Sequence, residues 1–295
     1  MINIVLGILG VLTGWFGIEF GKDLVENKDN LEGDTSWGTA GAIGAVTNFF
    51  DTLGIGSFAP TTALFKGFKQ VKDKVLPGTL NVACTIPVVA EAFIFISVIE
   101  VETVTLVSML ASATIGAWVG AGIVSKLPEK KVQYGMAIAL FVTASLMVAG
   151  QMGWMPVGGE AIGLSGIKLG VAIVANFILG ALMTLGIGMY APCMALIYML
   201  GMSAKVAFPI MMGSCAFLMP VASVKFIREG AYNRKASLAI SIAGLIGVFI
   251  AAYIVKSLPL NILTWLVIGV IYYTSVVMFR SAKGKTDADE KAAVA

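Results

Sequence analysis

Histidine is absent from this sequence of 295 residues, and cysteine and charged residues are scarce. Without histidine, the chain lacks the commonest general base and metal ligand of proteins. Its three cysteines all fall in apolar segments and form no CxxC motif, so neither a disulfide framework nor a cysteine-ligated metal is expected. No P-loop occurs either, which argues against direct use of ATP. We therefore expect no metal, no cofactor and no enzymatic activity.

The shortage of charge points to a membrane protein. Only 13% of the residues are charged, against about 25% in a typical soluble domain, and the mean hydropathy is +0.92. The net charge of +3 is small and no long basic run with interleaved aromatics occurs, so a nucleic-acid partner is not expected. The chain is predicted to be an all-α integral membrane protein embedded in the lipid bilayer.

Apolar segments long enough to cross a bilayer, which takes about 20 residues, recur from end to end. They are Ile2–Phe20, Pro77–Ile99, Thr103–Ser125, Val132–Gly150, Val206–Phe226, Ala236–Lys256 and Leu260–Phe279. Two longer stretches, Gly38–Phe65 and Lys168–Leu200, are interrupted by glycine and proline. The first segment has no basic start and no obvious cleavage site, so we expect a retained helix rather than a signal peptide.

The two interrupted stretches contain the same motif. Thr52–Leu64 reads TLGIGSFAPTTAL and Thr184–Leu196 reads TLGIGMYAPCMAL, with nine of thirteen positions identical. A second match, Ile115–Pro128 with Ile246–Pro259, is collinear with the first and has nearly the same spacing along the chain. Together they predict an internal repeat. The predicted parts are a leading helix with its loop, a first repeat, an extracytoplasmic linker, a second repeat and a cytoplasmic tail, at 1–37, 38–150, 151–167, 168–280 and 281–295.

Two glycines and a proline within seven residues interrupt each motif. Such a sequence frees backbone N–H and C=O groups, which cost several kcal/mol each in hydrocarbon unless protein or trapped water satisfies them. The arms on either side of the break, about 13–16 residues each, are shorter than the roughly 20 needed to cross alone. We expect each stretch to form a re-entrant hairpin, and one long broken span is the alternative.

The distribution of Lys and Arg discriminates between these two forms, because basic residues gather on the cytoplasmic face of membrane proteins. If both stretches cross fully, the 20 basic residues divide almost evenly between the two faces. If both are re-entrant, all except Lys168, Lys205 and Lys256 fall on one face. Each repeat then crosses an odd number of times, so the two repeats are inverted, with the N-terminus outside and the C-terminus in the cytoplasm.

Inverted repeats with interrupted helices are the recurring plan of secondary transporters, in which the breaks meet near the midplane and half-helix N-termini face the solute. Glycines at the breaks would let a solute approach the backbone. The substrate-binding residues predicted from the two motifs are Gly54, Gly56, Ser57, Thr61, Gly186, Gly188, Tyr190 and Cys193. The alternative is that these glycines only allow close packing of helices.

Few ionisable groups lie within the apolar segments. Asp51 precedes the first break, and Glu91 lies inside a later segment. Because burying such a group in a membrane is costly, either could carry a coupling proton, although Glu91 could instead pair internally. Asn48 and Asn81 could line the same cavity or join helices by hydrogen bonds, and Lys225 could snorkel to the cytoplasmic face.

Cysteines occur at related places in the two repeats. Cys84 and Cys215 are equivalent, and Cys193 stands where the first motif has Thr61. A thiol is a weak donor with a soft, polarizable sulfur, so cysteines beside a binding site suggest a ligand that contains sulfur. The alternative is that they are small apolar fillers of the core.

The motif Asn48–Gly56 followed by Pro60, its second copy Gly180–Pro192 and the short-looped hydrophobic repeats resemble the TauE/SafE family of exporters of sulfite and organosulfonates and related permeases. The resemblance covers nearly the whole chain after the first helix and implies an anion transporter of a prokaryotic inner membrane. The residues that it carries over are Phe50, Asp51, Gly54, Gly56, Pro60, Gly186, Gly188 and Pro192. Before the proline, the family usually has further glycines and an aliphatic residue, whereas this chain has Ser57–Ala59, which leaves the substrate open.

We therefore expect a secondary transporter of a small anion, such as sulfite, sulfoacetate, thiosulfate or a carboxylate, that works by alternating access between the two hairpin tips. Helix N-termini rather than arginine would select the anion, because no arginine is predicted at membrane depth. A proton or another cation could be coupled to transport, and assembly as a homodimer is left open. The alternatives are a membrane-embedded, thiol-dependent enzyme of sulfur chemistry and an anion channel.

Overall fold

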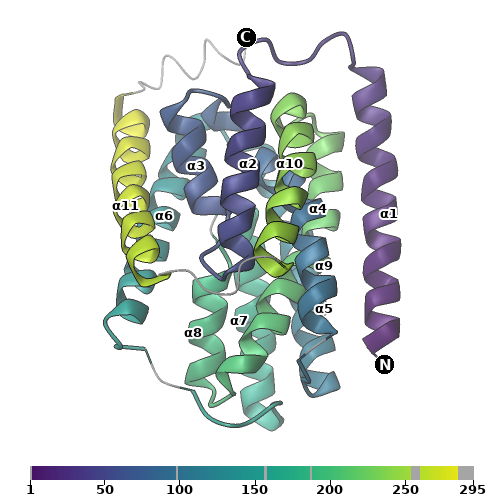
Figure 1. Cartoon of the computed structure of the whole chain (residues 1–295), viewed down its shortest axis with the longest axis vertical. Coiled ribbons are helices and arrows are strands. Elements are labelled where there is room, and N and C mark those ends of the chain that lie inside the picture. The colour runs from purple at the N-terminus through teal and green to yellow at the C-terminus, as the bar shows by residue number, and fades with distance from the viewer. Residues whose placement is uncertain (1, 98, 156–157, 187, 254–259, 285–295) are drawn as a thin grey trace.

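The computed structural model describes residues 2–97, 99–155, 158–186, 188–253 and 260–284, and helices make up nearly all of them (Figure 1). The helices are α1 (Ile2–Glu26), α2 (Trp37–Thr52), α3 (Phe58–Gly67), the short 3₁₀ helix η1 (Asp73–Val75), α4 (Leu76–Ile96), α5 (Thr103–Val124), α6 (Glu129–Gln151), α7 (Gly166–Met183), α8 (Tyr190–Met199), α9 (Ala204–Arg228), α10 (Arg234–Tyr253) and α11 (Leu260–Gly284). The predicted all-α fold is confirmed for this part of the chain.

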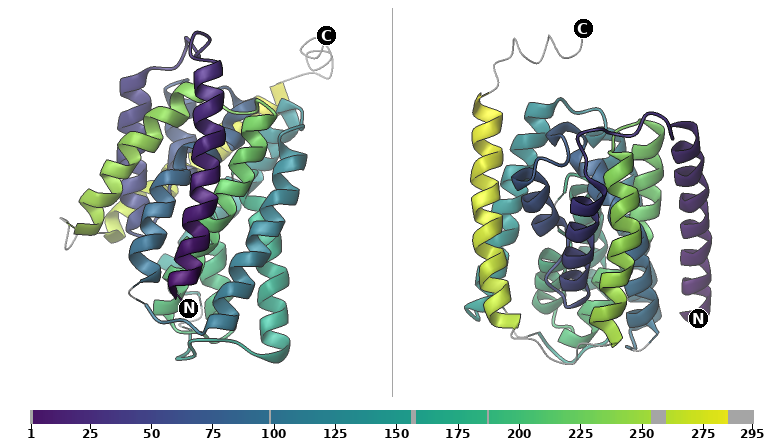
Figure 2. Two further views of the ribbon diagram at one scale, coloured as in Figure 1. Left: turned by 90° about the vertical axis from the view of Figure 1, so that its right-hand side faces the viewer. Right: turned by 45° about the horizontal axis from the view of Figure 1, so that its top comes forward.

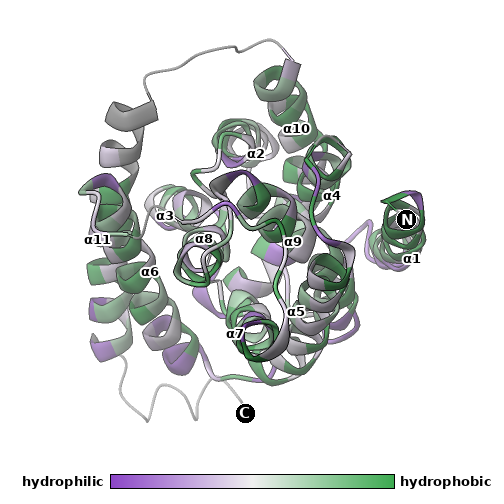
Figure 3. Cartoon of the chain, turned by 90° about the horizontal axis from the view of Figure 1, so that it is seen from below, coloured by the Kyte–Doolittle hydropathy of each residue, from purple (hydrophilic) through white to green (hydrophobic). Residues whose placement is uncertain are grey.

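Seven helices in the described part of the chain are long and apolar enough to cross a membrane: α1, α4, α5, α6, α7, α9 and α10. Large apolar side chains face outward from them, including Ile4 on α1, Ile115 on α5 and Phe141 on α6. Figure 3 shows that this apolar character continues around the bundle. Such a surface is suited to lipid and would be an aggregation liability in water, so the prediction of an integral membrane protein is confirmed.

Helix α9 lies at the centre of the bundle, where it packs against α4, α5 and α8 (Figure 3). It is also the most deeply buried of the apolar helices, followed by α4. Helices α1 and α11 stand at opposite edges, α1 beside α9 and α11 beside α6 (Figure 2). The start of α1 and the end of α11 lie at opposite ends of the bundle (Figure 1).

Two helix pairs, α2–α3 and α7–α8, each contain a break between their helices. Helices α2 and α3 occupy the upper half of Figure 1, whereas α7 and α8 occupy the lower half, and the two breaks come together in between. In the first break Gly54 and Gly56 have φ values of +88° and +90°, and in the second Gly186 has +101°. These left-handed conformations explain why glycine is needed at all three positions.

The arms of the two pairs are unequal, which differs from the arms of about 13–16 residues expected from the sequence. Helices α2 and α7 have 16 and 18 residues, whereas α3 and α8 have 10 each. Both short helices end in the same way, with a left-handed residue, Lys69 (φ 53°) or Gly201 (φ +86°), and a hydrogen bond back from the next N–H to a carbonyl five residues earlier. This is the Schellman arrangement, which stops a helix.

The shorter helices are held by close crossings with the long ones. A Cβ atom on Gly116 of α5 would lie 2.0 Å from the carbonyl oxygen of Phe177 in α7. A Cβ atom on Gly247 of α10 would lie 2.1 Å from the carbonyl oxygen of Ala45 in α2. Glycine therefore lets these backbones touch, as small residues do in membrane proteins. The two crossings join residues that have the spacing of the sequence repeat. Helix α5 packs against α7 in the same way that α10 packs against α2.

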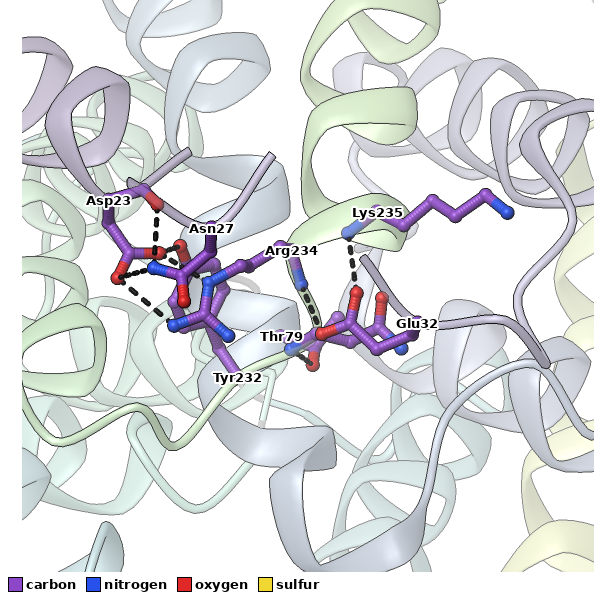
Figure 4. Close-up of polar contacts among 8 residues, drawn as sticks. Asp23, Asn27, Glu32, Thr79, Tyr232, Arg234 and Lys235 are labelled. Carbon is purple, nitrogen blue, oxygen red and sulfur yellow. Dashed lines mark hydrogen bonds and ion pairs between the residues drawn. The ribbon is translucent and has the colours of Figure 1, made fainter. Parts of the chain in front are cut away.

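Ion pairs and hydrogen bonds fasten the end of the bundle where α1 stops and α10 starts (Figure 4). Arg234 Nε donates to Asp23 at 2.6 Å, and the Tyr232 hydroxyl donates to the same carboxylate. Burial raises the pKa of the Tyr232 phenol, and its hydrogen bond to Asp23 adds to the effect. The carboxylate of Glu32 accepts the backbone N–H groups of Arg234 and Lys235 at 2.9 and 3.0 Å. The segment that leads into α2 is thus anchored to α10.

Basic side chains are concentrated at this same end. Lys126, after α5, lies 3.7 Å from Glu229, after α9, and Lys66 of α3 pairs with Asp73 of η1. Lys225 turns outward, where Nζ donates to the carbonyl oxygen of Trp118 at 3.2 Å and lies 4.3 Å from the centre of its ring. The side chain of Lys225 therefore extends outward, as the sequence interpretation of a snorkelling lysine expects.

Candidate functional site

Two small cavities, each of about 20 Å³, lie where the two breaks meet between α4, α6 and α9. The first is lined by Asp51, Gly56, Ser57, Phe58, Val88, Met183, Gly188, Met189, Tyr190 and Cys215. The second is lined by Ile55, Gly56, Phe58, Ala59, Thr143, Gly188, Tyr190 and Ala191. A cavity of this size has room for about one water molecule. The two cavities share four lining residues, Gly56, Phe58, Gly188 and Tyr190.

Two helix N-termini face these cavities. Helix α3 begins at Phe58 and α8 at Tyr190, and each has a proline, which carries no N–H, at its third position. The N–H groups of the first two residues of a helix have no acceptor within it, and the N-terminus carries partial positive charge. The N-cap residue Ser57 does not cap α3, because its hydroxyl is turned toward Asp51 instead. Backbone N–H groups that have no acceptor within their own helix thus lie beside the cavities.

Two buried carboxylates lie next to the breaks. Asp51 at the end of α2 accepts a hydrogen bond of 2.9 Å from Ser57. Glu91 of α4 accepts one of 2.8 Å from Thr52 and one of 3.0 Å from the Tyr190 hydroxyl, so it connects the first break to the start of α8. None of the ion pairs found among the described residues involves either carboxylate. Because a bare charge at this depth is costly, both groups are suited to binding protons.

Sulfur atoms form the opposite side of the first cavity. Cys215 of α9 and Met183 at the end of α7 both line it, with their sulfur atoms 3.6 Å apart, and Met189 lines it as well. Met183 and Met189 stand in the second motif at the positions of Asp51 and Ser57 in the first. The two halves of the site therefore differ chemically, with acid and hydroxyl groups from one and thioether and thiol groups from the other.

Several predicted site residues are brought together by the fold. Those that line a cavity are Gly56, Ser57, Gly188, Tyr190, Cys215 and Asp51. Glu91 belongs to the same group through its bond to Tyr190. Cys84 is fully buried and is not among the residues that line either cavity.

Other predicted residues face away from the cavities. Thr61 donates to Thr47 at 2.8 Å, and the Cys193 thiol lies 3.9 Å from the amide oxygen of Asn176. Gly54 lies beside the ring of Phe208. These contacts connect neighbouring helices and do not involve the cavity walls.

The remaining predicted residues pack within the core. Asn48 and Asn81 donate to Gly44 and Pro77, one turn earlier in their own helices. Each has a buried amide oxygen with no hydrogen-bond partner among the described residues. Gly186 packs on the side chain of Met136.

Some residues of the site were missed by sequence reasoning. Thr52, which holds Glu91, belongs to the quoted motif but was not singled out. Met183 and Met189 could have been found by aligning the two motifs, because they replace the polar residues of the first copy. Thr143 of α6 carries no such signal, since it lies in an apolar segment outside both motifs.

Comparison with known proteins bears directly on these residues. The family model described as sulfite exporter TauE/SafE matches residues 1–147 and 168–295, which include both breaks and both cavities. No curated protein and no solved structure matches the chain. The family match covers far more than half of the sequence and agrees with the resemblance seen in the motifs. This polytopic membrane protein therefore belongs to the TauE/SafE sulfite exporter family.

Proposed function

We propose that the protein is a secondary transporter that moves a sulfur oxyanion or an organosulfonate across a prokaryotic inner membrane by alternating access. Its family implies a membrane transporter of sulfite-type anions. The observation that carries the proposal is the meeting of the N-termini of α3 and α8 over small cavities inside an apolar bundle. Free backbone N–H groups at two helix N-termini favour an anion without any arginine.

The proposed mechanism needs two inverted repeats with re-entrant hairpins, α2–α3 in one and α7–α8 in the other. Two features support this arrangement. The hairpins occupy opposite halves of the bundle in Figure 1, and the crossings of Gly116 on Phe177 and of Gly247 on Ala45 are equivalent under the sequence repeat. Each hairpin thus packs against a long helix of the other repeat. Rocking of one repeat against the other would therefore open the gap between the hairpin tips from alternate sides of the membrane.

We further propose that the end bearing α3, η1 and the start of α10 is cytoplasmic, because nearly all basic residues lie there. Lys72 belongs to that end, Lys205 to the other, and both are exposed. In a background with all cysteines replaced, Lys205→Cys should react in intact cells with a thiol reagent that cannot cross membranes. Lys72→Cys should react only after the membrane is permeabilised. The reverse pattern would contradict the proposed orientation, and labelling of both in intact cells would contradict the hairpin topology.

Asp51 and Glu91 suggest how transport is coupled. An anion near two carboxylates is repelled unless these groups carry protons, so anion and proton favour each other's binding. We propose that the protein moves the two together, in the direction set by their combined gradients. The hydrogen bonds of Glu91 to Thr52 and Tyr190 support a proton site between the two hairpins, where a change of protonation would affect both.

Flux into proteoliposomes tests the proposed function. Purified protein should carry sulfite and small sulfonates saturably, with counter-transport of one labelled anion by another, and chloride should compete poorly. Vesicles without protein provide the baseline for leakage. Unsaturable flux without counter-transport would identify a channel instead, and absence of flux for every sulfur anion in the panel would contradict the substrate class.

The alternative of a thiol-dependent enzyme receives less support. All three cysteines are free and buried, and Cys193 faces Asn176 rather than a cavity. Reactive cysteines normally lie in accessible, electropositive surroundings.

A further inference from the structure

The hydroxyl of Thr143 on α6 is buried and has no hydrogen-bond partner in the described part of the chain. Many hydroxyls in these helices donate to the carbonyl one turn earlier, as Thr47 does to Ile43. Thr274 of α11, the residue equivalent to Thr143 in the second repeat, donates to the carbonyl oxygen of Val270 at 2.8 Å. Two other buried hydroxyls, those of Ser125 and Ser237, also lack a partner in the described part of the chain, but neither lines one of the two cavities.

Thr143 lines the second cavity, whose walls differ from those of the first. The second cavity includes the first two residues of α3, Phe58 and Ala59, and the first two of α8, Tyr190 and Ala191. The N–H groups at these positions have no acceptor within their own helix. None of the described residues that line the second cavity carries a carboxylate. The second cavity is thus lined by hydrogen-bond donors, which suit an anion. The carboxylate of Asp51 lines the first cavity instead.

We propose that the second cavity is the anion chamber and that Thr143 donates a hydrogen bond to an oxygen of the bound sulfite or sulfonate. The first cavity, with Asp51 and its sulfur wall, then serves the coupling proton. This assignment rests on the proposed transport function. It assigns anion binding and proton binding to two neighbouring cavities that share the residues Gly56, Phe58, Gly188 and Tyr190.

The small size of the second cavity requires that it expand during the transport cycle. About 20 Å³ accommodates one water molecule, and a sulfur oxyanion has at least four non-hydrogen atoms. The anion must therefore separate α6 from the tips of α3 and α8 when it binds. The Thr143 hydroxyl can bond the anion directly because α6 forms the wall opposite the tips of α3 and α8.

Removal of the Thr143 hydroxyl tests this assignment. Thr143→Val keeps the shape of the side chain, and we expect it to raise KM for sulfite and for a small sulfonate by about 10- to 100-fold, the usual effect of losing a donor to a charged group. Thr143→Ala should have the same effect, and Thr143→Ser should restore most of the affinity. The number of protons moved per anion should stay unchanged, because Asp51 and Glu91 are intact.

Thr274→Val is the matched control, because it removes an equally buried hydroxyl that has a backbone partner. It should leave KM unchanged, and thermal melting in detergent should show that all four variants are folded. A normal KM in both hydroxyl-free variants of Thr143, or an equal rise in Thr274→Val, would overturn the assignment of Thr143. Absence of sulfur-anion flux in the unmodified protein would instead overturn the proposed function itself.

Discussion

Gly188→Leu is expected to reduce anion flux at least 100-fold while leaving the protein folded in the membrane. Gly188 lines both cavities, and a Cβ atom built on it meets nothing within 4 Å. A side chain at this position enters the open space beside the cavities. Leucine is several times larger than the single water that each cavity can hold. Flux of sulfite or sulfonate into proteoliposomes, normalised to inserted protein, measures the loss.

Two further variants separate filling of the cavity from damage to the fold. Gly170→Leu makes the same change on the exposed surface of α7, where a Cβ also has open space, and should transport normally. Gly188→Ala should give an intermediate flux, because it adds one methyl group. Unimpaired transport by Gly188→Leu, with its insertion verified, would remove the cavities from the mechanism.

The equivalent change in the first break should have a mixed effect. Gly56 also lines both cavities, but its φ of +90° is strained for any other residue. Because of this strain, Gly56→Leu should abolish flux and also lower the melting temperature in detergent.

Glu91→Gln is expected to uncouple transport from the proton gradient. A difference of one pH unit is worth about 1.4 kcal/mol per proton, which supports tenfold accumulation for each proton coupled to an anion. Vesicles with the unmodified protein, alkaline inside, should accumulate a sulfonate to this extent, and those with Glu91→Gln should only equilibrate it. A sulfonate is the best probe, because it stays ionised over the working pH range and does not leak as a neutral acid.

The contacts of Glu91 supply the controls for this prediction. Tyr190→Phe removes one of its two hydrogen bonds and should weaken accumulation without abolishing it. Glu160→Gln changes an exposed carboxylate outside the site and should behave like the unmodified protein. Full pH-driven accumulation by Glu91→Gln would exclude this group as the proton carrier and leave Asp51, whose variant Asp51→Asn would then be tested in the same assay.

The motifs allowed part of the site to be foreseen. Gly56, Gly188, Asp51 and Tyr190 were predicted because broken backbone inside an apolar segment has few explanations, and they do line the cavities. Thr61 and Cys193 belong to the same motifs but point at Thr47 and Asn176, because helical rotation, not sequence position, decides which side of an arm faces the gap.

The acid and sulfur halves of the site depend on contacts between distant segments. Glu91 and Tyr190 are 99 residues apart, and their hydrogen bond forms because α4 passes the start of α8 in the packed bundle. A sequence cannot state such a contact, since its local pattern fixes neither the neighbour of a helix nor the rotation of the helix about its own axis.

Membrane character, helical class and family membership were determined by the sequence alone, because they depend on composition, on the length of apolar segments and on short motifs. The positions of the two breaks were determined in the same way, by glycine and proline. Only the tertiary structure decided that Thr143 joins the chamber, that Cys193 does not, and that Glu91 bridges the two breaks. These facts arise from packing, in which side chains distant in the chain compete for the same small space.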